Sequence, residues 1–333
     1  MRERRIMPAM RGPQRRRYSR SVQFEFFRIR FHFRAVDTVR FVDGNSANTL
    51  RGAFGTALLQ VACTSACITA ERGAAKHQSD CAYARIFEPR ATHANGPSGL
   101  ADWPRPFVFR TRHLDGRMLP PGEDFHFDLH LFDAQLPIVY FAEALKRLAS
   151  EGLGPGRGRA KLTGIEQRDV DDRLAACVWN GGELSPLAAP SSASLDADPC
   201  DAVRVRFVTP TELKCGETLV ERPEFSVLFA RIRDRLSTLR ALYGPGPLEI
   251  DFRGMGERAA RIKMTRCDLH DEHRLRRSSR TGQVHSLGGF TGEAEYQGDL
   301  GEFVPYLRTA RWTGVGRQTV WGKGEIDAES LAR

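Results

Sequence analysis

The sequence lacks any run that approaches the roughly 18 consecutive apolar residues of a membrane-spanning helix, which excludes a protein that crosses the bilayer on helices. Its first twenty residues are basic but lack the apolar stretch of a secretory signal. Cysteines number only seven in 333 residues. An odd count spread over a long chain argues against a disulfide framework and favours a reducing, cytoplasmic compartment.

What the chain does contain is enough apolar sequence for two domains. Hydrophobic residues make up 41% of it, and the length suits two domains of about 150 residues each. The net charge is +9, but eight arginines against Glu3 place +7 in residues 1–20 and leave +2 for the remainder. Such a basic tail suits contacts with nucleic-acid phosphates and is equally consistent with a disordered N-terminus.

Hydrophobic periodicity predicts two successive passes of the order β-α-β-β-α-β. Residues 22–33 alternate apolar and polar side chains as a half-buried strand does. The next predicted elements are a helix from Asn45, strands at 107–110 and 124–132, a helix at 137–148 and a strand at 160–166. The second pass has predicted strands at 202–208, 261–268, 289–296 and 319–326, a helix from Phe225, and a last helix capped by Asp299 and Glu302. This order predicts an α+β fold of tandem ferredoxin-like domains.

Composition places the boundaries between these parts. The prediction is a basic disordered tail (1–20), an N-terminal ferredoxin-like domain (21–180) with a long insertion at about 63–105, a linker or surface loop (181–201) and a C-terminal ferredoxin-like domain (202–328). Residues 181–201 are assigned to a linker because they are rich in Ser, Ala, Pro and Asp and show no sustained period.

A glycine-rich run lies near the end of the chain, with two Gly-x-Gly pairs, Arg317 between them and Lys323 inside the second pair. Glycine lets backbone N–H groups approach a phosphate closely because no Cβ blocks the way. The run is neither a Walker loop nor a dinucleotide fingerprint, since the predicted order around it is helix-loop-strand. Its candidates for binding a nucleic-acid backbone are Gly314, Gly316, Arg317, Gly322, Lys323 and Gly324.

Further basic residues cluster in the C-terminal half. The additional candidates for phosphate contacts are Arg274, Arg276, Arg277 and Arg280, which are predicted to form a hairpin, and Arg308 and Arg311 before the glycine run. Trp312 and Trp321 bracket the run. One of them could stack on a base, and Trp321 is expected to pack against the sheet.

Several short motifs follow one another along both halves of the chain. The C-terminal ones are Ser278-Ser-Arg280, Leu287-Gly-Gly-Phe-Thr-Gly-Glu293, Leu307-Arg308 and Gly314-x-Gly-x5-Gly-x-Gly324. The N-terminal ones are Leu50-Arg-Gly-Ala-Phe-Gly55, Cys81-Ala-Tyr-Ala-Arg-Ile-Phe-Glu-Pro89 and Pro97-Ser-Gly-Leu-Ala-Asp102. In order and spacing these motifs resemble the CRISPR pre-crRNA-processing endoribonucleases of the RAMP superfamily, in the branch with a long insertion after the first helix.

The resemblance covers nearly all of residues 22 to 326 and implies two ferredoxin-like domains with CRISPR repeat RNA bound across them. It implies RNA cleavage without a metal or other cofactor, in which the ribose 2′-hydroxyl attacks the adjacent phosphate and leaves a 2′,3′-cyclic phosphate and a 5′-hydroxyl. Such a reaction needs a base, an acid and cations for the developing charge. Subunits of a CRISPR effector complex are further implied partners, and the oligomeric state stays open.

The general base is where the sequence departs from the family pattern. Members often carry a catalytic histidine in or just after the first helix, and no histidine lies between Asn45 and Cys63. Imidazole suits the role because it titrates near neutrality, and position ranks the candidates in the order His77, His285 and His93. Two residues near His77 in the sequence are candidate partners, Lys76 and Tyr83. Histidines on predicted strands are expected to be structural, namely His32, His126 and His130.

His77 also belongs to a second pattern, Cys63-x3-Cys67-x9-His77-x3-Cys81. Four such ligands could close a tetrahedral zinc site, which would help an insertion poor in apolar residues to keep its shape. The Cys-x3-Cys spacing is looser than the usual knuckle, and Cys63 ends an apolar helical face where a buried thiol is common. The prediction is therefore for no metal, with zinc as the alternative. The two roles of His77 exclude each other, because a zinc ligand cannot also be the free base.

Two other functions stay open. A member of the same superfamily that has lost cleavage would serve as an RNA-binding scaffold in an effector complex, and the missing helix histidine is consistent with that role. A general RNA- or DNA-binding protein would show no preference for repeat sequence.

Overall fold

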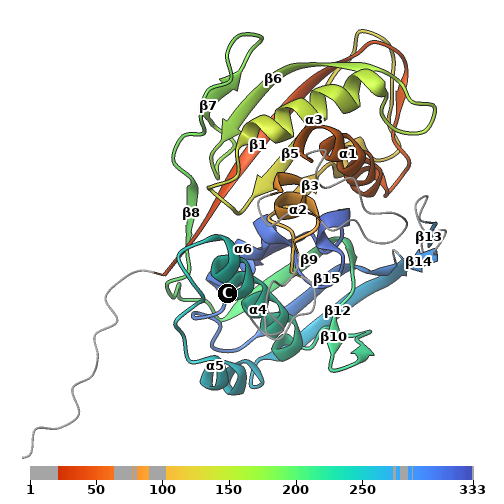
Figure 1. Cartoon of the computed structure of the whole chain (residues 1–333). Helices are drawn as coiled ribbons and strands as arrows, with labels where there is room; N and C mark the ends of the chain where they lie inside the picture. The colour runs from red at the N-terminus through yellow and green to blue at the C-terminus, as the bar shows by residue number, and fades with distance from the viewer. Residues whose placement is uncertain are drawn as a thin grey trace, which may run out of the picture.

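The computed structural model describes residues 22–63, 77, 81–89, 103–272, 275–277, 284–286 and 288–331, with only the backbone described for 275–277 and 284–286. Within these ranges the chain forms two units, each an antiparallel sheet covered by helices (Figure 1). None of the helices in the described ranges is long and apolar enough to cross a membrane. The predicted basic tail lies outside the described residues.

The N-terminal unit is built around β1, a 13-residue strand in which most odd-numbered side chains are buried. Its strands, in the order in which they lie side by side, are β3 (Phe107–Arg110), β5 (Asp124–Leu131), β1 (Gln23–Ala35), β6 (Ala160–Arg168) and β7 (Leu174–Trp179). Two helices, α1 (Ser46–Ala62) and α3 (Ile138–Glu151), pack against each other and cover the sheet (Figure 1). Phe54 of α1 joins these layers, because its ring contacts Phe109 of β3 and stacks on Phe141 of α3.

The C-terminal unit repeats this arrangement. Its strands, again in spatial order, are β12 (Lys263–Glu272), β15 (Gly289–Gln297), β9 (Ala202–Thr211) and β16 (Ile326–Ser330). Its helices are α4 (Phe225–Tyr243), α5 (Phe252–Ala259) and α6 (Val304–Thr313). In both units the first strand of the pass lies between the third and the fourth, and the second strand lies beside the third. The predicted α+β fold of tandem ferredoxin-like domains is therefore confirmed.

Short elements fill the connections. They are β2 (Val39–Arg40) paired with β4 (Met118–Leu119), β10 (Lys214–Cys215) with β11 (Thr218–Leu219), β13 (Leu275–Arg277) with β14 (Val284–Ser286), the helix α2 (Ala82–Phe87), and the 3₁₀ turns η3 (Arg112–Leu114) and η4 (Thr319–Trp321). The pair β13 and β14 is the hairpin predicted for the arginine cluster.

The two units share β1. The alternation of buried residues changes phase between Phe26 and Phe27, so that Phe27 and the residues after it pack in the N-terminal core. Phe24 and Phe26 instead pack in the core of the C-terminal unit, where Phe26 stacks on Trp312 with ring centroids 4.7 Å apart. One strand thus contributes to both cores and fixes the units against each other.

Two predicted element boundaries are wrong. The last strand begins at Ile326, not at Thr319, because Gln318 and Gly322 adopt positive φ and turn the chain at η4. The last helix begins at Val304, with Pro305 in its first turn, where the missing N–H of proline costs nothing. Glu302 therefore does not cap this helix and pairs with Arg258 instead. In the segment predicted as a linker, β8 (Ser191–Ser194) pairs with β1.

Candidate functional site

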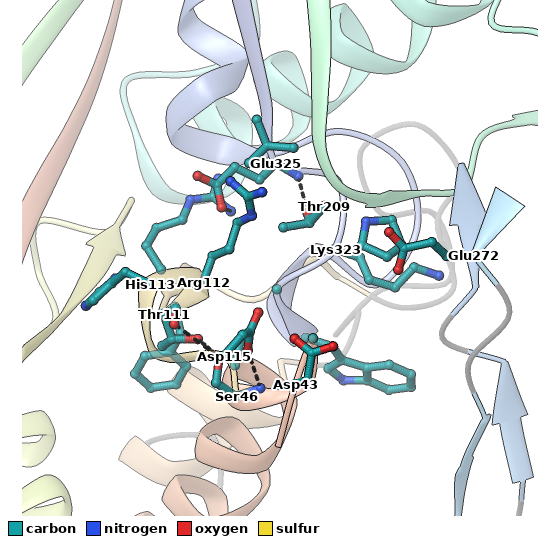
Figure 2. Close-up of a pocket in the computed structure, with 18 residues that line it drawn as sticks. Asp43, Ser46, Thr111, Arg112, His113, Asp115, Thr209, Glu272, Lys323 and Glu325 are labelled. Carbon is teal, nitrogen blue, oxygen red and sulfur yellow. Dashed lines mark hydrogen bonds and ion pairs between the residues drawn. The ribbon is translucent and has the colours of Figure 1, made fainter. Parts of the chain in front are cut away.

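A cavity of about 650 Å³ lies between the two units and is called the cleft below (Figure 2). Its N-terminal wall is formed by Asp43 and Ser46 at the start of α1 and by the η3 turn. Its C-terminal wall is formed by Thr209 of β9 and by the second half of the glycine run. This volume lies within the range of pockets that enclose a small molecule, so the cleft can hold a nucleotide.

The glycine run folds tightly on itself. All four of its glycines have positive φ, namely Gly314, Gly316, Gly322 and Gly324. A Cβ at Gly324 would lie 1.9 Å from the carbonyl oxygen of Val315, so no side chain fits there. The N–H groups of Gly314, Gly322 and Gly324 donate to carbonyl oxygens of the protein. Presentation of the backbone N–H to a phosphate, the expected role of the run, is therefore not available at these three glycines.

The second half of the run packs directly on α1. A Cβ at Gly322 would lie 2.4 Å from the Cβ of Ala47, in the first turn of that helix. The glycine is thus required for the close approach of the two walls of the cleft. It brings Trp321 and Lys323, its neighbours in the sequence, into the lining.

The two cations of the run share one buried carboxylate. The amine Nζ of Lys323 donates to Oε1 of Gln318 at 3.0 Å and lies 3.8 Å from Oε2 of Glu212. Arg317 pairs with the same Glu212, and its half-exposed side chain does not line the cleft. Burial lowers the pKa of Lys323, and the charge of Glu212 opposes that effect. Lys323 is therefore a buried amine fixed in the wall of the cleft.

The start of the glycine run is held from both units. Three side chains from β3, β5 and α4 donate to the last carbonyl oxygens of α6, each at 2.9 Å: the buried Arg110 to Arg311, the buried His130 to Trp312 and the partly buried Arg235 to Thr313. Such donors satisfy carbonyl groups that have no partner within the helix. Burial lowers the pKa of all three side chains, and that of His130 falls to about 3. His130 is therefore neutral and structural, as predicted.

His113 lies at the edge of the cleft in the η3 turn (Figure 2). Its Nε2 lies 2.8 Å from the carbonyl oxygen of His126 and must donate, since a carbonyl only accepts. In the neutral ring this leaves Nδ1 as the basic nitrogen. The ring also stacks on that of His126, whose pKa burial lowers to about 4. A neutral His126 places no positive charge against His113 at neutral pH.

Carboxylates line the cleft as well, so its charge is mixed. They are Asp43, Asp115, Glu272 and Glu325, against the cations Arg110, Arg112 and Lys323. Asp115 accepts the N–H of Ser46 at 3.0 Å and so satisfies a free donor at the start of α1. Glu325 lies 3.8 Å from the guanidinium of Arg110. These two carboxylates therefore have partners within the walls.

The histidine ranked first by position lies elsewhere. His77 is buried between Cys63 and Cys81 and does not line the cleft. Tyr83 stands beside it, with ring centroids 5.0 Å apart. His285, Arg276 and Arg277 belong to the β13–β14 hairpin, of which only the backbone is described. Five other predicted site residues lie outside the described residues, namely Cys67, Lys76, His93, Arg274 and Arg280.

The basic and aromatic residues around the glycine run divide between the cleft and other surfaces. Arg308 donates to Ser330 and pairs with Asp198, while Arg311 lies over Trp312, and neither arginine lines the cleft. Trp312 is buried against Phe26, which excludes it from stacking on a base. Trp321, expected to pack against the sheet, is partly buried against the N-terminal core and also lines the cleft.

Sequence reasoning missed Arg112 and His113. They lie two and three residues after the predicted strand 107–110, in the run Arg110-Thr-Arg-His113. A basic run at the end of a strand was the available signal. That signal alone does not predict a site residue, because the sequence does not show which strand ends face the glycine run.

Comparison with known families covers most of the chain. Residues 205–326 match the model of the CRISPR-associated endoribonuclease Cas6, and residues 24–191 match the N-terminal domain model AF_1859_N. No curated protein matches the sequence.

Solved structures with a similar fold include a Cas6 product complex, with a TM-score of 0.53 at 18% identity over 92% of this chain and 100% of that one. Cas6 of Thermus thermophilus gives a TM-score of 0.51 at 16% identity over 92% of this chain and 98% of that one. A chain of a partial Cas6-RT-Cas1–Cas2 complex gives 0.51 at 11% identity over 93% of this chain and 46% of that one. At these identities the likeness shows the fold alone.

Proposed function

The chain belongs to the CRISPR-associated endoribonuclease Cas6 family, and we propose on this premise that it cuts CRISPR repeat RNA in the cleft between its two ferredoxin-like units. The observation that carries the proposal is the contact of Gly322 with Ala47, which joins the glycine run to the first helix and forms a nucleotide-sized cleft at the junction. The repeat RNA lies across both units, and the scissile phosphate enters the cleft.

His113 is the general base of the proposed reaction. Its Nε2–H is held by the carbonyl of His126, so Nδ1 accepts the proton of the ribose 2′-hydroxyl. The freed oxygen bonds to phosphorus, and the bond from phosphorus to the 5′-oxygen breaks. The products are a 2′,3′-cyclic phosphate and a 5′-hydroxyl, with no metal in the step.

Lys323 donates the second proton, to the departing 5′-oxygen. Burial lowers its pKa, which makes the ammonium a better acid at neutral pH. Figure 2 shows Lys323 and His113 at opposite edges of the cleft, with the ring of His113 directed outward. The displacement at phosphorus requires the scissile phosphate to lie between them, with its attacking oxygen toward His113 and its leaving oxygen toward Lys323.

The chemistry is tested with repeat RNA from the array of the same genome, incubated with the full-length protein in excess EDTA. We expect one cut that leaves a cyclic phosphate, and no cut when the ribose before the scissile bond is 2′-deoxy, although that RNA still binds. Cutting of the deoxy substrate would refute attack by the 2′-hydroxyl. Specific binding of repeat RNA without any cut would identify a scaffold instead of an enzyme.

The residue roles are tested by substitution. His113→Ala should slow cleavage about 100- to 10,000-fold, the usual contribution of a general base, and leave RNA affinity nearly unchanged. His270→Ala is the matched control, because His270 is exposed on β12 and does not line the cleft. The earlier candidates are measured in parallel as His77→Ala, His93→Ala and His285→Ala. A wild-type rate for His113→Ala would overturn the assignment.

A further inference from the structure

Three side chains from residues 63–81 converge beside the end of α1. The Nδ1 of His77 lies 3.5 Å from the Sγ of Cys63 and 3.5 Å from the Sγ of Cys81. The two sulfur atoms are 3.9 Å apart. Cys81 and the ring of His77 are buried, and Cys63 is partly buried. The three ligand atoms thus form a compact and nearly equilateral triangle.

These distances are those of a tetrahedral zinc site. With Zn–S of about 2.3 Å and Zn–N of about 2.0–2.1 Å, two ligand atoms stand roughly 3.8 Å apart for S and S and roughly 3.6 Å apart for S and N. A disulfide would require sulfurs about 2.05 Å apart. A thiolate–imidazole pair for catalysis would need only one thiol at the ring, whereas here both sulfurs are equally close to the same nitrogen. The geometry therefore favours shared coordination of one ion.

The second nitrogen of His77 faces a carboxylate. Its Nε2 lies 3.9 Å from Oε2 of Glu88, and the hydroxyl of Tyr83 donates to Oε1 of the same Glu88 at 3.4 Å. Histidine ligands of metals usually direct the other ring N–H toward a carboxylate, carbonyl or water, which fixes the tautomer that leaves the first nitrogen free to bind. At 3.9 Å Glu88 lies beyond hydrogen-bond distance of Nε2, so it places a negative charge on that side of the ring without bonding to it.

The cluster joins two helices. Cys63 directly follows α1, and Cys81 directly precedes α2, which has only six residues. A helix this short is not stable alone in water, and Phe87 at its end packs so closely on α1 that a Cβ at Gly55 would lie 2.2 Å from the ring. Because α1 has 17 residues, its two ends are about 25 Å apart. The cluster is therefore at the opposite end of α1 from the cleft and takes no part in its chemistry.

We propose that Cys63, His77 and Cys81 bind one structural zinc ion, which fixes α2 to the end of α1. Thiolate and imidazole ligands at these distances suit Zn²⁺ better than Mg²⁺ or Ca²⁺, which take oxygen ligands. The sequence pattern named Cys67 as a fourth ligand, and that residue lies outside the described residues. The assignment therefore covers three ligands. The proposed zinc site is independent of RNA cleavage and is tested by the metal content of the protein.

The test measures the metal content of the purified full-length chain by inductively coupled plasma mass spectrometry. Wild-type protein should contain about one zinc per chain, and Cys63→Ser, Cys81→Ser and His77→Ala should each reduce it below about one-tenth. Cys215→Ser is the matched control, since Cys215 is an exposed thiol on β10, and it should keep the full content. Wild-type protein without zinc after reconstitution under reducing conditions would overturn the proposal, as would iron with sulfide in its place.

A second measurement tests the site on the wild-type protein, so that it remains informative if the variants fail to fold. Cobalt replaces zinc in the wild-type protein, and thiolate ligands in a tetrahedral site give it intense visible absorption. His77→Cys should keep both the metal and that absorption, because thiolate can replace imidazole as a ligand. A cobalt spectrum without thiolate character would refute the site even if every variant were insoluble. RNA cleavage is not a readout, so failure of the proposed function leaves this test intact.

Discussion

His130 should make the stability of this protein depend on pH in a specific range. The side chain is 4% exposed, and its Nδ1 donates to the carbonyl of Trp312 at the end of α6. Burial lowers its pKa to about 3, and the nearby charge of Arg110 acts in the same direction. In the unfolded chain the pKa returns to about 6.5. Between these values the unfolded state binds a proton that the folded state does not, so stability falls as the pH falls.

The size of the effect follows from the two pKa values. At pH 5 the unfolded His130 is almost fully protonated and the folded one almost fully neutral. Each pH unit below 6.5 costs about 1.4 kcal/mol, so the free energy of unfolding should fall by about 2 kcal/mol between pH 7.5 and pH 5. This loss is large against the ~5–15 kcal/mol that stabilises a typical domain.

Urea unfolding at several pH values measures the effect, with tryptophan fluorescence as the signal, because the ring of Trp312 lies 5.3 Å from that of His130. His130→Gln is the comparison, since its amide can donate to the same carbonyl but does not titrate. Other groups titrate alike in both proteins, so the difference between the two curves isolates His130. The wild type should lose about 2 kcal/mol more than the variant between pH 7.5 and pH 5. Parallel curves would refute the reasoning.

Two further predictions concern the glycine run. Gly324→Ala places a Cβ 1.9 Å from a backbone oxygen at positive φ and should lower the unfolding free energy by about 3 kcal/mol or more in urea, whereas Gly182→Ala, with open space around it, should change it little. Glu212→Gln leaves the buried Lys323 without its counter-charge and should cost about 3–5 kcal/mol. Adding Lys323→Met should recover part of that loss, and an additive double variant would count against the pairing.

Much of the fold could be predicted because its signals are local. The alternation in β1 and the spacing of apolar residues in α4 each follow from residues a few positions apart, and they define the order of the elements. Boundaries were less accurate where a turn depends on packing. The η4 turn, for instance, depends on Gly322 resting against Ala47, more than 200 residues earlier in the sequence.

The site could be predicted only in part. The glycine run could be identified from the sequence because its glycines can be read directly. The hydrogen bonds of its N–H groups could not be predicted, since one of their acceptors is the carbonyl of Pro210, on another strand. The burial of Trp312 could not be predicted for the same reason. Trp312 is buried by Phe26, which the phase change in β1 directs toward the other unit.

By itself the sequence determined the tandem α+β order, the place of the glycine run between the last helix and strand, and the Cys/His pattern around His77. Only the tertiary structure decided that His113 and Lys323 line one cleft, that Glu212 holds both cations of the run, and that His77 lies with two thiols. The physical reason is the distance along the chain over which each interaction acts. Periodicity and turn chemistry act between neighbours, whereas the charge, burial and partners of a side chain depend on segments that folding brings together from distant parts of the chain.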